Sequence, residues 1–148
     1  MLQGSLESRP PGLPDALYVH VPFCAHACAF CNFYTELFKP ADVEPFLSAL
    51  FSELDALPKN FLPRTIFIGG GTPTVLPLPA LDRLLLHLGR RFHSPRLAEW
   101  TVEATPVTLS PEVAACLKNR GVTRVSVGVE SFEGRFLKAL GRPQKPGE

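Results

Sequence analysis

YVHVPFCAHACAFCNF (Tyr18–Phe33) joins a short apolar segment to three closely spaced cysteines. The apolar segment, ALYVHVP (16–22), is rich in β-branched and aromatic residues and predicts a buried strand. Cys24, Cys28 and Cys31 follow it, separated by three residues and then by two. We therefore expect a strand that leads into a loop carrying three thiols.

Thiolates at such close spacing bind soft metals, and two kinds of metal site fit them. A structural zinc site needs four protein ligands, so His20 or His26 would have to join the cysteines. An iron–sulfur cubane is the second possibility, because three cysteines suffice when one iron takes an exchangeable ligand. Three ordinary buried cysteines are the alternative without a metal. We favour the cluster, and expect three flanking aromatic rings to keep water away from it: Phe23, Phe30 and Phe33.

A strand followed by a helix is predicted four times along the chain. Further strands are predicted at 65–68, 99–104 and 124–131, and helices at 42–57, 78–92, 110–121 and from 133 onward. The third helix has clear boundaries, with Ser110 as N-cap, Pro111 at its first position and Gly121 just after its end. Such alternation predicts parallel strands with right-handed crossovers, in a barrel or a doubly wound sheet.

The ends of the predicted strands carry unusual residues. In parallel α/β folds, functional residues gather at the carboxyl ends of the strands, so these residues are expected to share one rim. The glycine run 69–71 would let a ligand approach the backbone closely, although a tight strand-to-helix turn would also explain it. Glu103 could bind a ligand or form a surface salt bridge. The residues expected at the rim are the cysteine loop, Gly69 to Thr72, Glu103 and Glu130.

Composition excludes several functional classes. The chain has 148 residues, with 15 basic and 14 acidic side chains, and this balance argues against a nucleic-acid surface. It contains no run of 18 apolar residues, so no membrane span is expected. Residues 1–15 lack the apolar core of a signal peptide and predict a disordered lead before one domain, 16–148. We therefore expect a cytoplasmic protein with reduced thiols.

Five blocks resemble a known family. CAHACAFC after the first strand resembles the CxxxCxxC loop of the radical S-adenosylmethionine (SAM) superfamily. YVHVPFC, GGGTPT, TVEATP and GVTRVSVGVESFEGRFLKALGR resemble the oxygen-independent coproporphyrinogen III oxidase family, in the family's order. The resemblance, from Tyr18 to Arg142, implies an α/β partial TIM barrel with four parallel strands, each followed by a helix. The barrel would be incomplete, so we expect a chain truncated at its C-terminus.

The resemblance also implies cofactors and the residues that bind them. The three cysteines would hold a [4Fe-4S] cluster, SAM would chelate the fourth iron, and an electron donor such as flavodoxin or ferredoxin would reduce the cluster. Glu130 and Arg142 match positions that contact a second SAM, but the family commonly has Gln at position 130 and His at position 144, where this chain has Gln144. The positions implied for the first SAM are Tyr18, Phe30, Gly70, Gly71, Thr72 and Glu103.

Two functions remain within this family. An oxidase, a coproporphyrinogen dehydrogenase-type oxidoreductase, would decarboxylate propionates of coproporphyrinogen III in porphyrin biosynthesis. A haem chaperone of the HemW-type branch would bind haem and transfer it to acceptor proteins, with haem ligands expected beyond residue 148. Oxidases carry another cysteine two residues after the third cluster cysteine, where this chain has Phe33, so we favour the chaperone. A radical enzyme acting on another substrate, such as a methyltransferase, is a more distant alternative.

Overall fold

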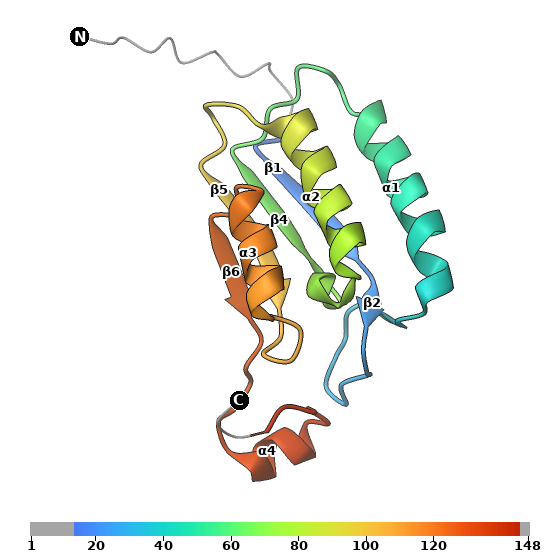
Figure 1. The fold of residues 1–148 in the computed structure, drawn as a ribbon, viewed down its shortest axis with the longest axis vertical. Coiled ribbons are helices and arrows are strands. Elements are labelled where there is room, and N and C mark those ends of the chain that lie inside the picture. The colour runs from blue at the N-terminus through green and yellow to red at the C-terminus, as the bar shows by residue number, and fades with distance from the viewer. Residues whose placement is uncertain (1–13, 146–148) are drawn as a thin grey trace, which may run out of the picture.

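Four parallel strands form the sheet in this computed structural model, which describes residues 14–145. They are β1 (Ala16–Val21), β4 (Thr65–Gly70), β5 (Glu99–Ala104) and β6 (Arg124–Val127), in the spatial order β1-β4-β5-β6 (Figure 1). The first residues of β1, β4 and β5 lie level with one another, since Ala16 lies opposite Thr65 and Thr65 opposite Glu99. The carboxyl ends of the strands therefore meet at one edge of the sheet, as expected.

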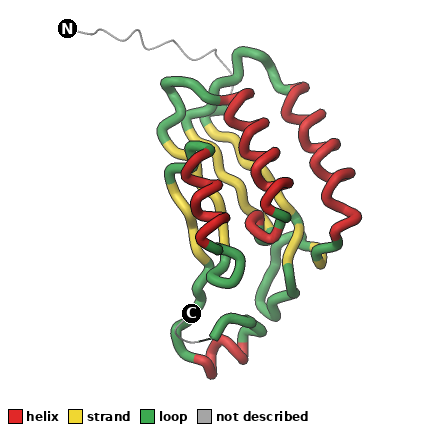
Figure 2. Tube along the Cα trace, viewed as in Figure 1, coloured by secondary structure: helices red, strands yellow, loops and turns green. Residues whose placement is uncertain are grey.

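Three helices cover the same face of this sheet. They are α1 (Val43–Ala56), α2 (Leu78–Phe92) and α3 (Pro111–Asn119), and all three lie in front of the strands in Figures 1 and 2. A doubly wound sheet would carry helices on both faces, whereas a barrel carries them only outside. The single helical layer thus confirms the barrel type of α/β fold. The short helix α4 (Gly134–Ala139) lies apart, beyond the carboxyl ends of the strands (Figure 1).

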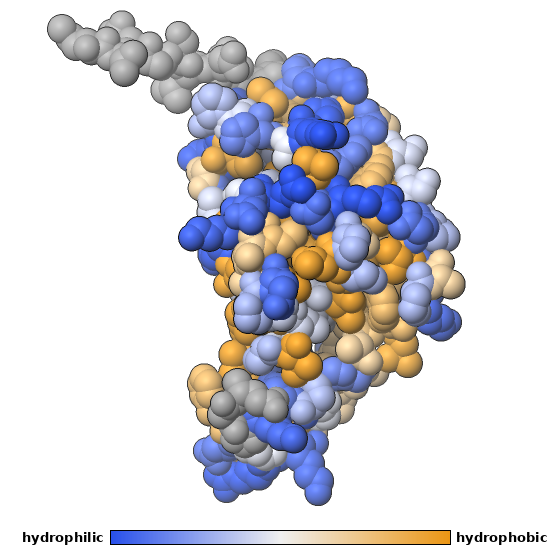
Figure 3. Space-filling view, viewed as in Figure 1, coloured by the Kyte–Doolittle hydropathy of each residue, from blue (hydrophilic) through white to orange (hydrophobic). Residues whose placement is uncertain are grey.

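The core lies between the sheet and the helices. α2 contributes most to it, because its apolar stripe faces the middle strands, and Leu81, Leu84, Leu85, Leu88 and Phe92 are all fully buried. Within residues 14–145 no helix covers the opposite face of the sheet, and Tyr18 on that face is 53% exposed. The outer side of the helices mixes hydrophilic and hydrophobic residues, as expected where amphipathic helices meet water (Figure 3).

Several predicted boundaries are confirmed by the structure. The strand at 99–104 and the helix at 78–92 have the predicted ends. Ser110 caps α3 as expected, since its hydroxyl accepts a hydrogen bond of 3.3 Å from the backbone amide of Val113. Asp42 stands at the N-cap of α1, but its side chain makes no capping hydrogen bond.

The fourth strand was predicted too long, and Glu130 does not lie at its end. β6 stops at Val127, and Gly128 makes the last backbone bond to the neighbouring strand, 2.9 Å to the carbonyl of Ala104. The chain then turns sharply, and Glu130 takes a left-handed conformation with φ of 63°. An alternating apolar pattern cannot show this turn, because it depends on contacts with the later segment: Gln144 donates 2.8 Å to the carbonyl of Val129.

Two short strands and two 3-10 helices were not predicted. β2 (Phe23–Cys24) and β3 (Glu36–Leu37) pair on either side of the cysteine loop, and the 3-10 helices span Pro40–Asp42 and Pro73–Val75. These elements are too short for a periodic pattern to appear in the sequence.

The ends of the chain fall largely outside the described residues. Residues 1–13 of the predicted lead lie there, while the carbonyl of Asp15 accepts a 2.7 Å bond from the amide of Arg64. Within residues 14–145, no helix has the length and apolar character needed to cross a membrane.

Candidate functional site

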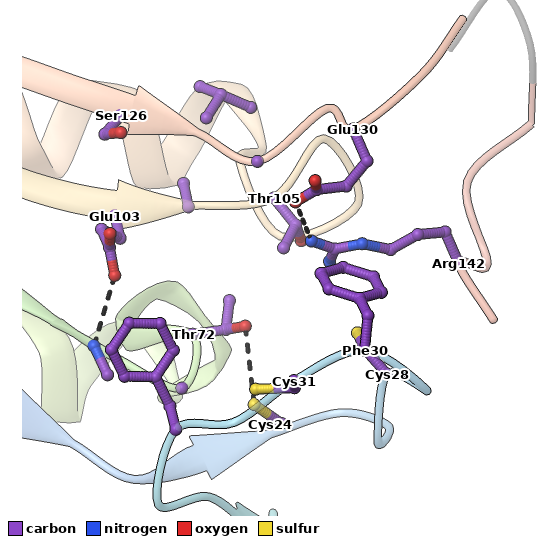
Figure 4. Close-up of a pocket in the computed structure, with 16 residues that line it drawn as sticks. Cys24, Cys28, Phe30, Cys31, Thr72, Glu103, Thr105, Ser126, Glu130 and Arg142 are labelled. Carbon is purple, nitrogen blue, oxygen red and sulfur yellow. Dashed lines mark hydrogen bonds and ion pairs between the residues drawn. The ribbon is translucent and has the colours of Figure 1, made fainter. Parts of the chain in front are cut away.

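A cavity of about 210 Å³ lies where the strands end (Figure 4). It brings together residues from four segments that are far apart in the sequence, as the rule on strand ends predicted. Its lining comprises the three cysteines with Phe30 and Phe33, Gly70 to Thr72 after β4, Glu103 to Thr105 around the end of β5, and Ser126, Val127, Gly128, Glu130 and Arg142.

The two ends of the cysteine loop are tied to each other by the pairing of β2 with β3. The amide of Glu36 donates 2.9 Å to the carbonyl of Pro22, and the amide of Phe38 donates 2.8 Å to that of Cys24. Between these bonds the loop carries three free thiols; Cys24 and Cys28 are half-buried and Cys31 is exposed. The strand pairing therefore fixes the ends of the loop beside the cavity.

The surroundings of Cys24 favour its neutral thiol. Burial is the main cause of its raised pKa, and the nearby Cys31 and Cys28 raise the pKa further. The hydroxyl of Thr72, 4.0 Å from Cys24 Sγ, and the positive charge of Arg142 act in the opposite direction. Three thiolates at this position would thus need a strong positive charge from a bound metal centre.

The side chains around the cavity fit an iron–sulfur cluster better than a structural zinc site. Among the described residues, no three His, Cys, Asp or Glu side chains are close enough to hold a single ion. His20, considered as a fourth zinc ligand, is engaged elsewhere: Nε2 lies 2.9 Å from the carbonyl of Tyr34 and Nδ1 3.2 Å from the Tyr18 hydroxyl. A cubane presents a separate iron to each thiolate, so three reduced thiols around one cavity fit that group.

The glycine run is required by contacts within the chain itself. Gly70 has φ of 107°, and a Cβ there would lie 2.6 Å from the ring of His20. A Cβ on Gly71 would lie 2.5 Å from the carbonyl oxygen of Phe23. The explanation as a tight turn is therefore supported. The absence of side chains also leaves the backbone of both glycines open toward the cavity.

Glu103 reaches across the sheet toward the glycine run. Its Oε2 accepts a 3.2 Å hydrogen bond from the amide of Gly70 (Figure 4). Burial raises the pKa of this carboxyl group, and the bond from Gly70 only partly offsets the effect. A partly buried carboxylate that faces a cavity and bonds a backbone amide differs from the surface salt bridge considered as its alternative, and it is suited to binding a polar ligand.

Replacing Glu103 with Gln is expected to stabilise the metal-free chain at pH 7. Folding raises the pKa of Glu103. Protonated Glu103 therefore contributes stability to the folded chain at low pH, and this contribution is lost as pH rises through the raised pKa. Glutamine removes the charge and keeps an oxygen for the amide of Gly70. The urea midpoint should therefore rise at pH 7, and the gain should vanish below about pH 4, near the ordinary pKa of glutamate.

Glu112 offers a matched control for that measurement. It is an exposed carboxylate whose pKa is lowered mainly by the Ser110 hydroxyl, so Glu112→Gln should give no gain at pH 7. Equal midpoints for the parent and Glu103→Gln at pH 7 would contradict the assigned role of burial.

Two aromatic residues expected near the cofactor do not line the cavity. Tyr18 lies on the open face of the sheet, stacked at 6.0 Å on Phe67, and burial and the nearby charge of Glu103 raise its pKa, so its contact with SAM stays a prediction. Phe23 was expected to shield the thiols, but it is buried in the core, with its ring 5.1 Å from that of Phe46. The expectation for Phe23 is corrected, because its side chain turns into the core. Phe30 and Phe33 do line the cavity, although Phe33 remains 69% exposed.

Glu130 and Arg142 form an ion pair at the far side of the cavity. Arg142 Nη2 donates to Glu130 Oε1, and the guanidinium lies 5.7 Å from the centre of the Phe30 ring (Figure 4). This pairing was not expected from the sequence, because the two residues lie on either side of α4.

His20 is a residue whose structural role the sequence analysis missed. It was considered only as a zinc ligand, whereas its ring packs against Gly70 and binds the carbonyl of Tyr34, just after the cysteine loop. The signal was its position in the strand, two residues after Tyr18 and on the same face of the sheet.

Comparison with known proteins agrees with this geometry. The model of the family described as the radical SAM superfamily matches residues 18–148. The chain belongs to the radical SAM superfamily. As a radical SAM protein it is 40% identical over 129 residues to the heme chaperone HemW of Lactococcus lactis, covering 87% of this chain and 34% of the relative. HemW of Bacillus subtilis is 41% identical over 132 residues, covering 86% and 35%.

A solved structure is similar to this radical SAM chain as well. It is the coproporphyrinogen III oxidase HemN from Escherichia coli, described as a radical SAM enzyme, with a TM-score of 0.81 and 30% identity. The match covers 93% of this chain and 33% of HemN. The chain thus spans about a third of the length of these relatives.

Proposed function

We propose that this radical SAM chain binds a [4Fe-4S] cluster through Cys24, Cys28 and Cys31 and SAM at the iron that lacks a protein ligand. The observation that carries the proposal is that all three thiols share one cavity with the Gly70–Thr72 turn and Glu103. A three-cysteine loop would be an incomplete ligand set for a closed metal site. It is complete when the cofactor supplies the remaining ligands. Bound in this way, SAM would be a source of radical chemistry, and the three cysteines and the glycine turn would hold the cluster and the cofactor beside each other.

The residues around the cavity have separate roles in this proposal. Gly70 and Gly71 present backbone to SAM, with Thr72 beside Cys24, and Glu103 accepts hydrogen bonds from the amino or hydroxyl groups of the cofactor. Phe30 covers one side. Tyr18, predicted to contact SAM, also holds His20, since its hydroxyl lies 3.2 Å from His20 Nδ1. The second SAM predicted at Glu130 and Arg142 would have to compete with the ion pair that these residues form.

The response of the cluster to SAM tests this proposal. After anaerobic reconstitution and reduction, SAM is expected to change the electron paramagnetic resonance spectrum, because two of its atoms join one iron. Adenosine, which lacks the amino and carboxylate groups of the methionine part, serves as the control and should leave the spectrum unchanged. A spectrum that SAM leaves as it is would contradict the proposal.

For the complete protein, we propose a haem chaperone that receives haem and transfers it to an acceptor protein, with flavodoxin or ferredoxin as electron donor. Two observations support this choice: the HemW relatives, and Phe33 at the position where oxidases carry another cysteine. Phe33 lines the cavity without offering a thiol to it.

The second candidate is the oxidase, favoured by the TM-score of 0.81 to coproporphyrinogen III oxidase. One assay on the full-length protein distinguishes the chaperone from the oxidase. The chaperone should bind haem, seen by absorbance, and should form no protoporphyrinogen from coproporphyrinogen III with SAM and a reductant under anaerobic conditions. Product formed over many turnovers would replace the chaperone with the oxidase.

A further inference from the structure

The charges around the cavity are uneven. Among the described residues that line it, Arg142 is the one cationic side chain, while Glu103 and Glu130 are both acidic. Arg142 does not face an incoming ligand as a free charge, because its guanidinium already donates to Glu130 (Figure 4). We refer to Phe30, Gly128, Glu130 and Arg142 as the Arg142 arm of the cavity.

The cationic partner of this ion pair is enclosed, while the acidic partner is partly open to solvent. The side chain of Arg142 is 10% exposed and that of Glu130 32%. The ring of Phe30 covers the guanidinium from one side. On the other side stands Gly128, where a Cβ would lie 3.2 Å from Glu130 Oε1 and 3.3 Å from Arg142 Nη2. Because the guanidinium is enclosed, leaving it without a partner is costly.

The backbone also directs Glu130 toward Arg142. Glu130 is the one non-glycine residue with a positive φ in the described part of the chain, and this conformation is unfavourable for a side chain that carries a Cβ. It persists because the flanking segment is fixed: Gln144 holds the carbonyl of Val129, and the amide of Arg142 donates 2.9 Å to the carbonyl of Leu137. The carboxylate is thus held in place before any ligand arrives.

We propose that Glu130 sets the charge specificity of the Arg142 arm, with its carboxylate taking the place on Arg142 that the carboxylate of a ligand would otherwise take. A ligand carboxylate could take the Nη2 donor of Arg142 only by displacing Glu130. That would leave Glu130 without its partner and add a further negative charge to a cavity that already holds Glu103 and Glu130. Ligand groups that are neutral or cationic meet no such penalty. The arm therefore rejects carboxylates, and this specificity is independent of the proposed cluster and cofactor.

The isosteric change Glu130→Gln tests this directly in the metal-free chain. It removes the competing charge and preserves the volume of the side chain, so Arg142 should become able to bind a small carboxylate. Propionate is the probe, and its neutral isostere propionamide is the control ligand. Binding is followed at the Nε–H signal of Arg142 by ¹⁵N nuclear magnetic resonance. We expect Glu130→Gln to bind propionate at least about tenfold more tightly than the parent, and propionamide equally weakly in both.

Two further variants make the result specific to this pair. Glu133→Gln removes an exposed carboxylate that pairs with Arg135 on the same segment, and it should behave as the parent does. The double change of Glu130→Gln with Arg142→Gln should lose the gained affinity, measured by calorimetry because the Arg142 signal is absent. An equal response of Arg142 to propionate in the parent and in Glu130→Gln, whether both shift or neither does, would overturn the proposal.

Discussion

Changing Cys24, Cys28 or Cys31 to alanine is expected to abolish assembly of the cluster, whereas Cys116→Ala should retain it. The three thiols line one cavity, and the loss of any one leaves an iron without its protein ligand. Cys116 belongs to α3 and does not line the cavity; its Sγ lies 3.5 Å from Asp82 Oδ1. After anaerobic reconstitution, the parent and Cys116→Ala should each contain about four irons and four sulfides per chain, and the three other variants almost none.

The free energy of unfolding provides a second readout for these variants. The surroundings of Cys24 favour a neutral thiol, so the metal-free Cys24→Ala chain should unfold at nearly the same urea concentration as the metal-free parent. The loss of iron would then reflect the missing ligand and not a loss of folding. One zinc per chain with no iron, and no response to SAM, would contradict the cluster.

The layout of the fold could be predicted because it depends on local patterns. The apolar stripe of α2, the cap at Ser110 and the strand at 99–104 were predicted from short-range signals, and the structure confirms each of them. The end of β6 could not be predicted in this way. RVSVGVES continues the alternation beyond Val127, and the turn at Glu130 depends on a bond from Gln144, a residue 15 positions from Val129.

The sequence predicted which strand ends form the site, but not the direction in which each side chain points. Because parallel strands end at one edge, the cysteine loop, the glycine turn and Glu103 could be placed together from sequence alone. Tyr18 does not line the cavity although Glu103 lies near it, and the short pairing of β2 with β3 turns Phe23 into the core. The ion pair of Glu130 with Arg142 needed the path of the chain through α4, which no periodic signal reports.

The glycine turn serves the cysteine loop as well as any ligand, and Gly71→Ala is expected to show this. The amide of Gly71 donates 2.8 Å to the carbonyl of Val21, and that of Thr72 donates 2.8 Å to the carbonyl of Phe23. A Cβ on Gly71 would lie 2.5 Å from that same Phe23 oxygen, a backbone atom that cannot rotate away. We expect Gly71→Ala to lower the free energy of unfolding by about 3 kcal/mol, measured with urea.

Gly89→Ala is the matched control, because the same added methyl group has the opposite effect there. Gly89 lies within α2, and its Cβ would stand 3.8 Å from the ring of Trp100, an ordinary contact. Alanine also suits a helix better than glycine, so this variant should gain about 1 kcal/mol. The residue before Cys24 would be displaced only by Gly71→Ala, which should therefore also retain less iron than Gly89→Ala after reconstitution. If Gly71→Ala were as stable as the parent and lost only the response to SAM, the turn would act on the ligand alone, and the cysteine loop would keep its position without it.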